Sequence, residues 1–297
     1  MRRLLLILGM ATALHAHHEP GVTIALLDEQ IQRTPQVAEL FYQRGVEFLA
    51  MNQLEKSRAD FAAALALKND YLPAKRCLAQ IDFQSGKPAE ALNTLRTALA
   101  NVPKEHQFLL PACHQLEGAI LLSLHQPDAA LKALELALDT KFPELYTWQL
   151  RAEAQQALGK IDESIAGLKA AWEKSRAVIL RNAWIDALLD AGKPDEALPV
   201  IEEELASNRF LSSWLIRRAR ANQVKDAAAS AADLRAAIDE LTPRLATDPP
   251  AISLLCDRGL AYALLGDFSA AEADRVRARS LGASPANLRL LNKTLLR

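Results

Sequence analysis

The stretch GKPAEALNTLRTAL, from Gly86 to Leu99, decides the fold, because variants of it recur along the chain. The same combination of a turn, acidic residues, small residues and large apolar residues returns in HQPDAALKALELAL (125–138), GKIDESIAGLKAAW (159–172), GKPDEALPVIEEEL (192–205) and GDFSAAEADRVRAR (266–279). Self-similarity at a period of about 20–50 residues is the signature of repeat architectures. We therefore expect stacked repeats and no single large globular core.

Seven repeats follow when each is anchored on one of these segments. They begin at Ala38, Leu72, Pro111, Leu145, Val178, Leu211 and Ile252. The twentieth residue is small in every repeat: Ser57, Ala91, Ala130, Ser164, Ala197, Ser230 and Ala271. The eighth residue is small except at Ile185 and Arg218, and the twenty-fourth is large and apolar except at Arg275. This pattern predicts close contact between positions 8 and 20, with position 24 filling the space between neighbouring pairs.

Each repeat reads as two helices of about 12–14 residues joined by a short turn. Gly86 stands where the first helix must end, since glycine adopts the left-handed cap without steric cost. Pro88 follows at a helix start, where its missing N–H is tolerated. Departures from the pattern at Ile185, Arg218 and Pro199 predict looser packing or a kink in the fifth and sixth repeats.

These repeats resemble tetratricopeptide repeats, on the residues Trp148, Ala152, Ser164, Leu168 and Ala171 of the fourth and Gly259, Tyr262, Gly266, Ala271 and Ala278 of the seventh. The resemblance covers residues 38–285 and implies an all-α, right-handed α-solenoid of about seven helix-turn-helix repeats. A helix within residues 17–37 and a closing helix over 286–297 are expected to cap its ends, because a solenoid must cover its last apolar faces.

The N-terminus has the pattern of a secretory signal peptide. Arg2 and Arg3 precede an apolar run from Leu4 to Leu14, and the small residue Ala16 follows. The run is shorter than the roughly 20 residues that a bilayer span requires. A buried first helix is the alternative interpretation. We expect residues 1–16 to be removed, the mature protein to be periplasmic or secreted, and no stable membrane insertion after cleavage.

Composition narrows the classes of function. The 297 residues are 50% hydrophobic and 24% charged, with a net charge of −1, which fits a folded protein and offers nucleic acid no basic surface. No phosphate-binding loop, nucleophile motif or metalloprotease motif is present. We therefore expect no enzyme activity, no cofactor and no nucleic-acid partner. Cys77, Cys113 and Cys256 match no metal-binding spacing, and we expect buried thiols. Whether Cys77 and Cys113 form a disulfide is left open by the sequence.

The resemblance also implies a concave groove, lined by the first helix of each repeat, that holds an extended peptide or a partner's helix. By helical spacing, positions 2, 5, 9 and 12 of those helices face it. The candidate residues are Tyr42, Arg76, Gln80, Gln115, Tyr146, Gln149, Glu153, Asn182 and Asp186. Their amides can pair with a peptide backbone irrespective of its sequence. This predicts a non-enzymatic adaptor that binds a protein or peptide; side chains that are merely solvated are the alternative.

A second function is suggested by the histidines after the apolar run. Cleavage after Ala16 would leave a chain that begins His17-His18-Glu19. A free α-amine beside imidazoles is a ligand set for Cu²⁺ or Ni²⁺. The alternative function is therefore a periplasmic metal-handling protein with the repeats as a docking platform. A polar tether without metal is the simpler interpretation of the same residues.

Overall fold

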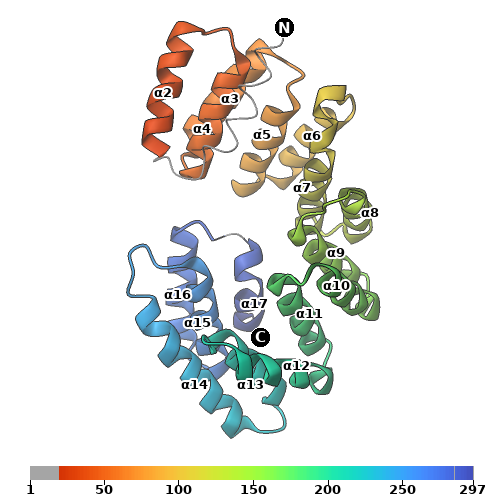
Figure 1. Ribbon diagram of the computed structural model, residues 1–297, viewed down its shortest axis with the longest axis vertical. Helices are drawn as coiled ribbons and strands as arrows, with labels where there is room; N and C mark the ends of the chain where they lie inside the picture. The colour runs from red at the N-terminus through yellow and green to blue at the C-terminus, as the bar shows by residue number, and fades with distance from the viewer. Residues whose placement is uncertain (1–19, 284, 297) are drawn as a thin grey trace. The chain divides into compact units, whose positions relative to one another are not determined.

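A computed structural model of the chain (Figure 1) describes residues 20–283 and 285–296. All regular secondary structure in these residues is helical, and the helices pack in consecutive pairs, which confirms the all-α repeat fold. The described chain divides into two compact units, with the boundary in the sequence between Lys160 and Ile161. Each unit is described by itself. The proposed signal peptide and His17 and His18 lie outside the described residues.

The described part of the N-terminal unit, from residue 20 on, begins with helix α2 and contains three complete helix pairs and the first helix of a fourth. Its elements are α2 (Pro20–Arg33), α3 (Ala38–Ala50), α4 (Leu54–Leu67), α5 (Leu72–Gln84), α6 (Pro88–Leu99), the 3₁₀ helix η2 (Lys104–Leu109), α7 (Leu110–Ser123), α8 (Pro127–Leu138) and α9 (Leu145–Ala157). The first helices of the repeats, α3, α5, α7 and α9, begin at the expected repeat starts or one residue away. Helix η2 takes up the extra residues that lengthen the second repeat.

The C-terminal unit contains three further pairs between an opening and a closing helix. Its elements are α10 (Ile161–Ser175), α11 (Val178–Asp190), α12 (Pro194–Ser207), α13 (Ser212–Asn222), α14 (Ala227–Arg244), α15 (Ile252–Leu265), α16 (Phe268–Ser280) and α17 (Pro285–Leu295). Gly266 ends α15 with φ 85°, the left-handed conformation that glycine adopts at no steric cost.

Small residues bring the two helices of a pair into contact, as the pattern predicts. The Ser57 hydroxyl, at position 20, donates to the carbonyl oxygen of Gly45, at position 8, over 2.6 Å. A Cβ atom on Gly45 would lie 2.7 Å from Cε1 of Phe61, and one on Gly118 would lie 2.4 Å from Cγ of Leu134. Phe61 and Leu134 hold position 24, so the large residue of each pair packs directly over the glycine.

The fifth and sixth repeats differ from each other, and only the fifth packs as loosely as expected. In the fifth, α11 and α12 pack less extensively than the helices of the other pairs that lie within one unit, and α12 continues through Pro199. In the sixth, α13 and α14 pack closely, so the expected loosening there is wrong. The reason is a shift of one residue in the register: α13 begins at Ser212, and the buried Ala219, not Arg218, is the small contact residue, whose carbonyl oxygen accepts from the Ser230 hydroxyl over 2.9 Å. Arg218 instead pairs with Asp233 on α14 through two hydrogen bonds of 2.8 and 2.7 Å.

Candidate ligand-binding face

The candidate site is the first-helix face, which we define as the surface at positions 2, 5, 9 and 12 of the first helix in each repeat. In the N-terminal unit α3, α5, α7 and α9 form it. Seven of the nine candidate residues lie there: Tyr42, Arg76, Gln80, Gln115, Tyr146, Gln149 and Glu153. Asn182 and Asp186 lie on α11 in the C-terminal unit.

One end of this face in the N-terminal unit is an aromatic cluster. The Tyr42 ring packs edge-on against Tyr71, with 5.4 Å between centroids, and Tyr71 packs against His106 at 5.5 Å. Burial raises the pKa of Tyr42 to about 12. Tyr42 therefore stays neutral and contributes chiefly to packing.

The middle of the face carries hydrogen-bonding groups without partners. Gln80 and Gln149 are half-buried, and neither side chain makes a hydrogen bond within the described part of the chain. The Arg76 Nε is buried without an acceptor among the described residues. Tyr146 and Glu153 are exposed. Because polar groups of this kind are normally paired, the half-buried amides of Gln80 and Gln149 are available to a ligand.

Gln115 differs, because its amide already ties two repeats together. It donates to Thr147 Oγ1 over 2.7 Å and to Glu144 Oε2 over 3.2 Å, which links α7 to the start of α9. A small surface pocket beside Gln115 is bordered by Phe108 and Phe142, which are 75% and 80% exposed. Both phenylalanines stand three residues before the start of a repeat, outside positions 2, 5, 9 and 12 of the first helix.

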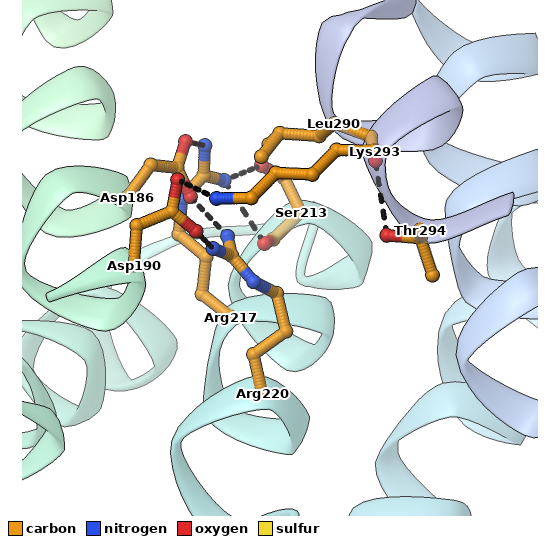
Figure 2. Close-up of polar contacts among 8 residues, drawn as sticks. All are labelled: Asp186, Asp190, Ser213, Arg217, Arg220, Leu290, Lys293 and Thr294. Atoms are coloured by element: carbon orange, nitrogen blue, oxygen red, sulfur yellow. Dashed lines mark hydrogen bonds and ion pairs between the residues drawn. The ribbon is translucent and has the colours of Figure 1, made fainter. Parts of the chain in front are cut away.

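In the C-terminal unit Asp186 is enclosed in an ionic network and does not line an open groove. It is 6% exposed, and its carboxylate accepts from Arg217 Nη2 over 2.8 Å and from Arg220 (Figure 2). Burial opposes ionisation, but the two guanidinium groups outweigh it and hold the pKa of Asp186 below its ordinary value. Asn182 Oδ1 is buried nearby on the same helix without a donor from the described residues.

The closing helix α17 covers part of the first-helix face in this unit. The amphipathic helix expected at this end is present, but it lies mainly against α15, the first helix of the seventh repeat. Leu288 and Leu291 are 3% and 1% exposed, and a Cβ atom on Gly259 would lie 2.9 Å from Cδ2 of Leu291. Lys293 Nζ lies 2.9 Å from Asp190 Oδ2, so α17 also reaches α11 in the fifth repeat (Figure 2).

Leu291 packs over Gly259 in the seventh repeat, in the place that position 24 occupies in other repeats. In the first and third repeats the residue at position 24 packs over the glycine at position 8, whereas here position 24 is Arg275. Arg275 pairs instead with Glu272 on its own helix. Leu291 therefore fills from α17 the space over Gly259 that the repeat itself leaves open.

Asp257 on α15 is a carboxylate near Arg217 and Asp186 that has no partner within the described residues. It makes no hydrogen bond or ion pair within the described residues. Burial raises its pKa to about 6, with Arg217 opposing the shift and Asp186 adding to it. The folded chain therefore carries a net cost for the charge on Asp257 at neutral pH.

The three cysteines lie within the described residues. Cys77, Cys113 and Cys256 are buried free thiols, and burial raises the pKa of Cys113 and of Cys256 to about 11. No group of three or more potential ligands in the described residues is placed to hold a metal ion. No helix of the described chain is long and apolar enough to cross a membrane.

Comparison with known proteins identifies the fold. The sequence matches no protein-family model and none of the curated proteins compared with it. A tetratricopeptide repeat protein from Parabacteroides merdae has a similar structure, with 16% identity, a TM-score of 0.56 and coverage of 73% of this chain and 85% of that chain. Human IFIT1, solved as a dimer with PPP-AAAA, has 16% identity, a TM-score of 0.54 and coverage of 88% and 68%.

Proposed function

We propose that this chain, which is a tetratricopeptide-repeat-type α-solenoid, is a non-enzymatic interaction scaffold that binds a peptide or partner protein on the first-helix face of its N-terminal unit. The observation that carries the proposal is the pair of half-buried amides, Gln80 on α5 and Gln149 on α9, which have no hydrogen-bond partner in the described chain. Together with the exposed Tyr146 they offer polar and aromatic contacts on one surface.

A backbone-reading ligand fits these side chains. A glutamine amide both donates and accepts, so it pairs with the N–H and C=O of an extended peptide without selecting a side chain. The exposed carboxylate of Glu153 and the half-buried guanidinium of Arg76 would then set which charges the ligand carries and where.

We also propose that the protein acts in the cell envelope or outside the cell. Support comes from the basic start, the apolar run and Ala16 in residues 1–16. Mass analysis of the protein purified from its own cells tests this. A mature chain that begins at His17 supports export, whereas a chain that retains Arg2 and Arg3 contradicts it.

Site-specific photo-crosslinking tests the binding face. A photoreactive amino acid replaces Gln149 in one variant and Glu135, an exposed residue of the second helix α8, in the matched control. We expect one partner to crosslink from position 149 and not from 135. Equal crosslinking from both positions, or none from 149 in cells that contain the partner, contradicts the proposal.

A further inference from the structure

We propose that the first-helix face of the C-terminal unit is a docking surface for one amphipathic helix of a partner protein, and that α17 occupies this surface as a ligand from the same chain. The inference rests on the proposed function, because it treats the first-helix face as the ligand-binding surface. It adds the C-terminal unit to that surface and states the form of ligand that it accepts.

Helix α17 is not the first half of an eighth repeat. Where one repeat follows another, the first helix packs chiefly against the second helix of the preceding pair, as α9 does against α8 and α15 against α14. Helix α17 packs chiefly against α15 and only slightly against α16. It therefore lies on the first-helix face, where a ligand would lie, and not at the end of the stack.

The apolar contacts of α17 define the shape that the face accepts. Leu288 and Leu291 join the buried cluster that includes Cys256 and Ala263, which hold positions 5 and 12 of the seventh repeat. Residues three apart share one side of a helix. Gly259 provides the depression that receives Leu291, since any side chain there would collide with it. A helix with two leucines three residues apart reproduces both contacts.

The polar contacts of α17 define the charge that the face accepts. Asp186 is neutralised by Arg217 and Arg220, and Arg220 also lies 3.0 Å from Asp190 Oδ1. The other oxygen of Asp190 pairs with Lys293 of α17. The ligand pattern is therefore Leu-x-x-Leu-x-Lys, in which the base stands two residues after the second leucine, as Lys293 follows Leu291.

The attachment of α17 makes it a strong competitor for this surface. A short link that contains Gly282, with φ 89°, joins it to α16. A tethered ligand acts at a high effective concentration, typically in the millimolar range for short links. A separate helix of the same pattern binds measurably only when the contacts of α17 are weakened or its own are better.

Fluorescence anisotropy with a labelled synthetic peptide of residues 285–297, PANLRLLNKTLLR, tests the proposal on the full chain. We expect the Lys293→Glu chain to bind this peptide at least tenfold more tightly than the wild-type chain does, because its own α17 is repelled by Asp190. The matched control is Arg289→Glu, the same charge change on α17 at a residue with no ion pair within the described chain. It should bind the peptide as weakly as wild type.

A charge reversal separates docking from non-specific binding to a loosened chain. The Asp190→Lys chain should prefer the peptide that carries Lys293→Glu over the unaltered peptide by at least tenfold. Equal binding of both peptides, or binding to the Lys293→Glu chain no tighter than to the Arg289→Glu control, overturns the proposal.

Hydrogen exchange on the wild-type chain decides the matter if either variant fails to fold. Amides of α17 should exchange at least tenfold faster than those of α15, because a displaceable helix opens without the repeats. Exchange of α17 together with α15 overturns the proposal. Crosslinking from Gln149 in the N-terminal unit is independent of every one of these outcomes, so the two proposals can fail separately.

Discussion

Arg258 and Asp274 join the two helices of the seventh repeat through two parallel hydrogen bonds of 2.8 and 2.7 Å. They hold positions 7 and 23 of the repeat, and Arg44 and Asp60 hold the same positions in the first and form the same pair, at 2.8 and 2.6 Å. Bidentate pairs of this kind fix geometry as well as contributing energy. The same device therefore fastens the first and last helix pairs.

Removal of Asp274 should leave the partly buried charge of Arg258 without its partner. We expect Asp274→Ala to lower the free energy of unfolding of the C-terminal unit by about 3 kcal/mol in urea denaturation, because the Arg258 guanidinium loses its acceptor where it is only partly solvated. The control is Lys225→Ala, which breaks an ion pair whose side chains are 57% and 78% exposed and should cost less than about 1 kcal/mol. Equal effects would contradict the assigned role.

The close helix contact at Gly118 predicts opposite signs for two glycine substitutions. Gly118→Ala should destabilise the N-terminal unit by about 1–3 kcal/mol, because the new methyl group meets Leu134. Gly21→Ala should stabilise it by up to about 1 kcal/mol, since nothing lies within 4 Å of that Cβ and alanine is the better helix former. Thermal and urea denaturation measure both; a stabilising Gly118→Ala would be inconsistent with the packing described.

Asp257 should make stability depend on pH. Its pKa is raised from 3.8 to about 6 in the folded chain, so the folded state binds the proton more tightly than the unfolded state. Its favourable contribution is full below pH 3.8 and is lost as the pH rises through 6. We expect Asp257→Asn to raise the free energy of unfolding by about 1–3 kcal/mol at pH 8 and to have no such effect at pH 4.

Urea denaturation of both chains across this range measures the difference. Asp239→Asn, at an exposed position of α14, serves as the control and should leave the pH profile of stability unchanged. A difference between wild type and Asp257→Asn that is independent of pH would show that the substitution acts through packing and not through the charge.

The N-terminal histidines make a separate prediction about metal. If the mature chain begins at His17, we expect it to bind Cu²⁺ in isothermal titration, and His17→Ala/His18→Ala to weaken binding at least tenfold, because an α-amine and imidazole nitrogens form the ligand set. His114→Ala, a substitution within α7, is the control and should leave affinity unchanged. Equal affinity of all three chains would assign these residues to a simple tether.

The fold could be predicted from the sequence because the decisive signal is local and repeated. Small residues at positions 8 and 20, such as Gly45 and Ser57, recur at a fixed spacing, and this spacing can be read directly from the sequence. The ion pairs at positions 7 and 23 have a signal of the same kind, because Arg258 and Asp274 repeat the separation of Arg44 and Asp60. Pairing cannot be read from that separation alone, since a charged residue on a helix is usually solvated.

The candidate site could be predicted only where it depends on helical spacing. Gln80 and Gln149 follow from their positions within a repeat. The burial of Asp186 does not, because its partners Arg217 and Arg220 come from the next repeat and stand at positions 7 and 10 in the predicted count from Leu211, outside the set expected to face the groove. The helix begins one residue later, at Ser212. The course of α17 was also beyond prediction, since an amphipathic pattern reveals that a helix buries one side but not the surface against which it packs.

The dissociation constant of the crosslinked partner tests the binding face most directly. Isothermal titration would compare the wild-type chain with the double variant Gln80→Ala/Gln149→Ala. The side chains of Gln80 and Gln149 make no hydrogen bond within the described chain, so the double variant should keep the melting temperature of wild type. We predict at least a tenfold weaker affinity for the double variant, since each lost hydrogen bond is worth about 0.5–1.5 kcal/mol. An unchanged dissociation constant in a folded variant would contradict binding at this face.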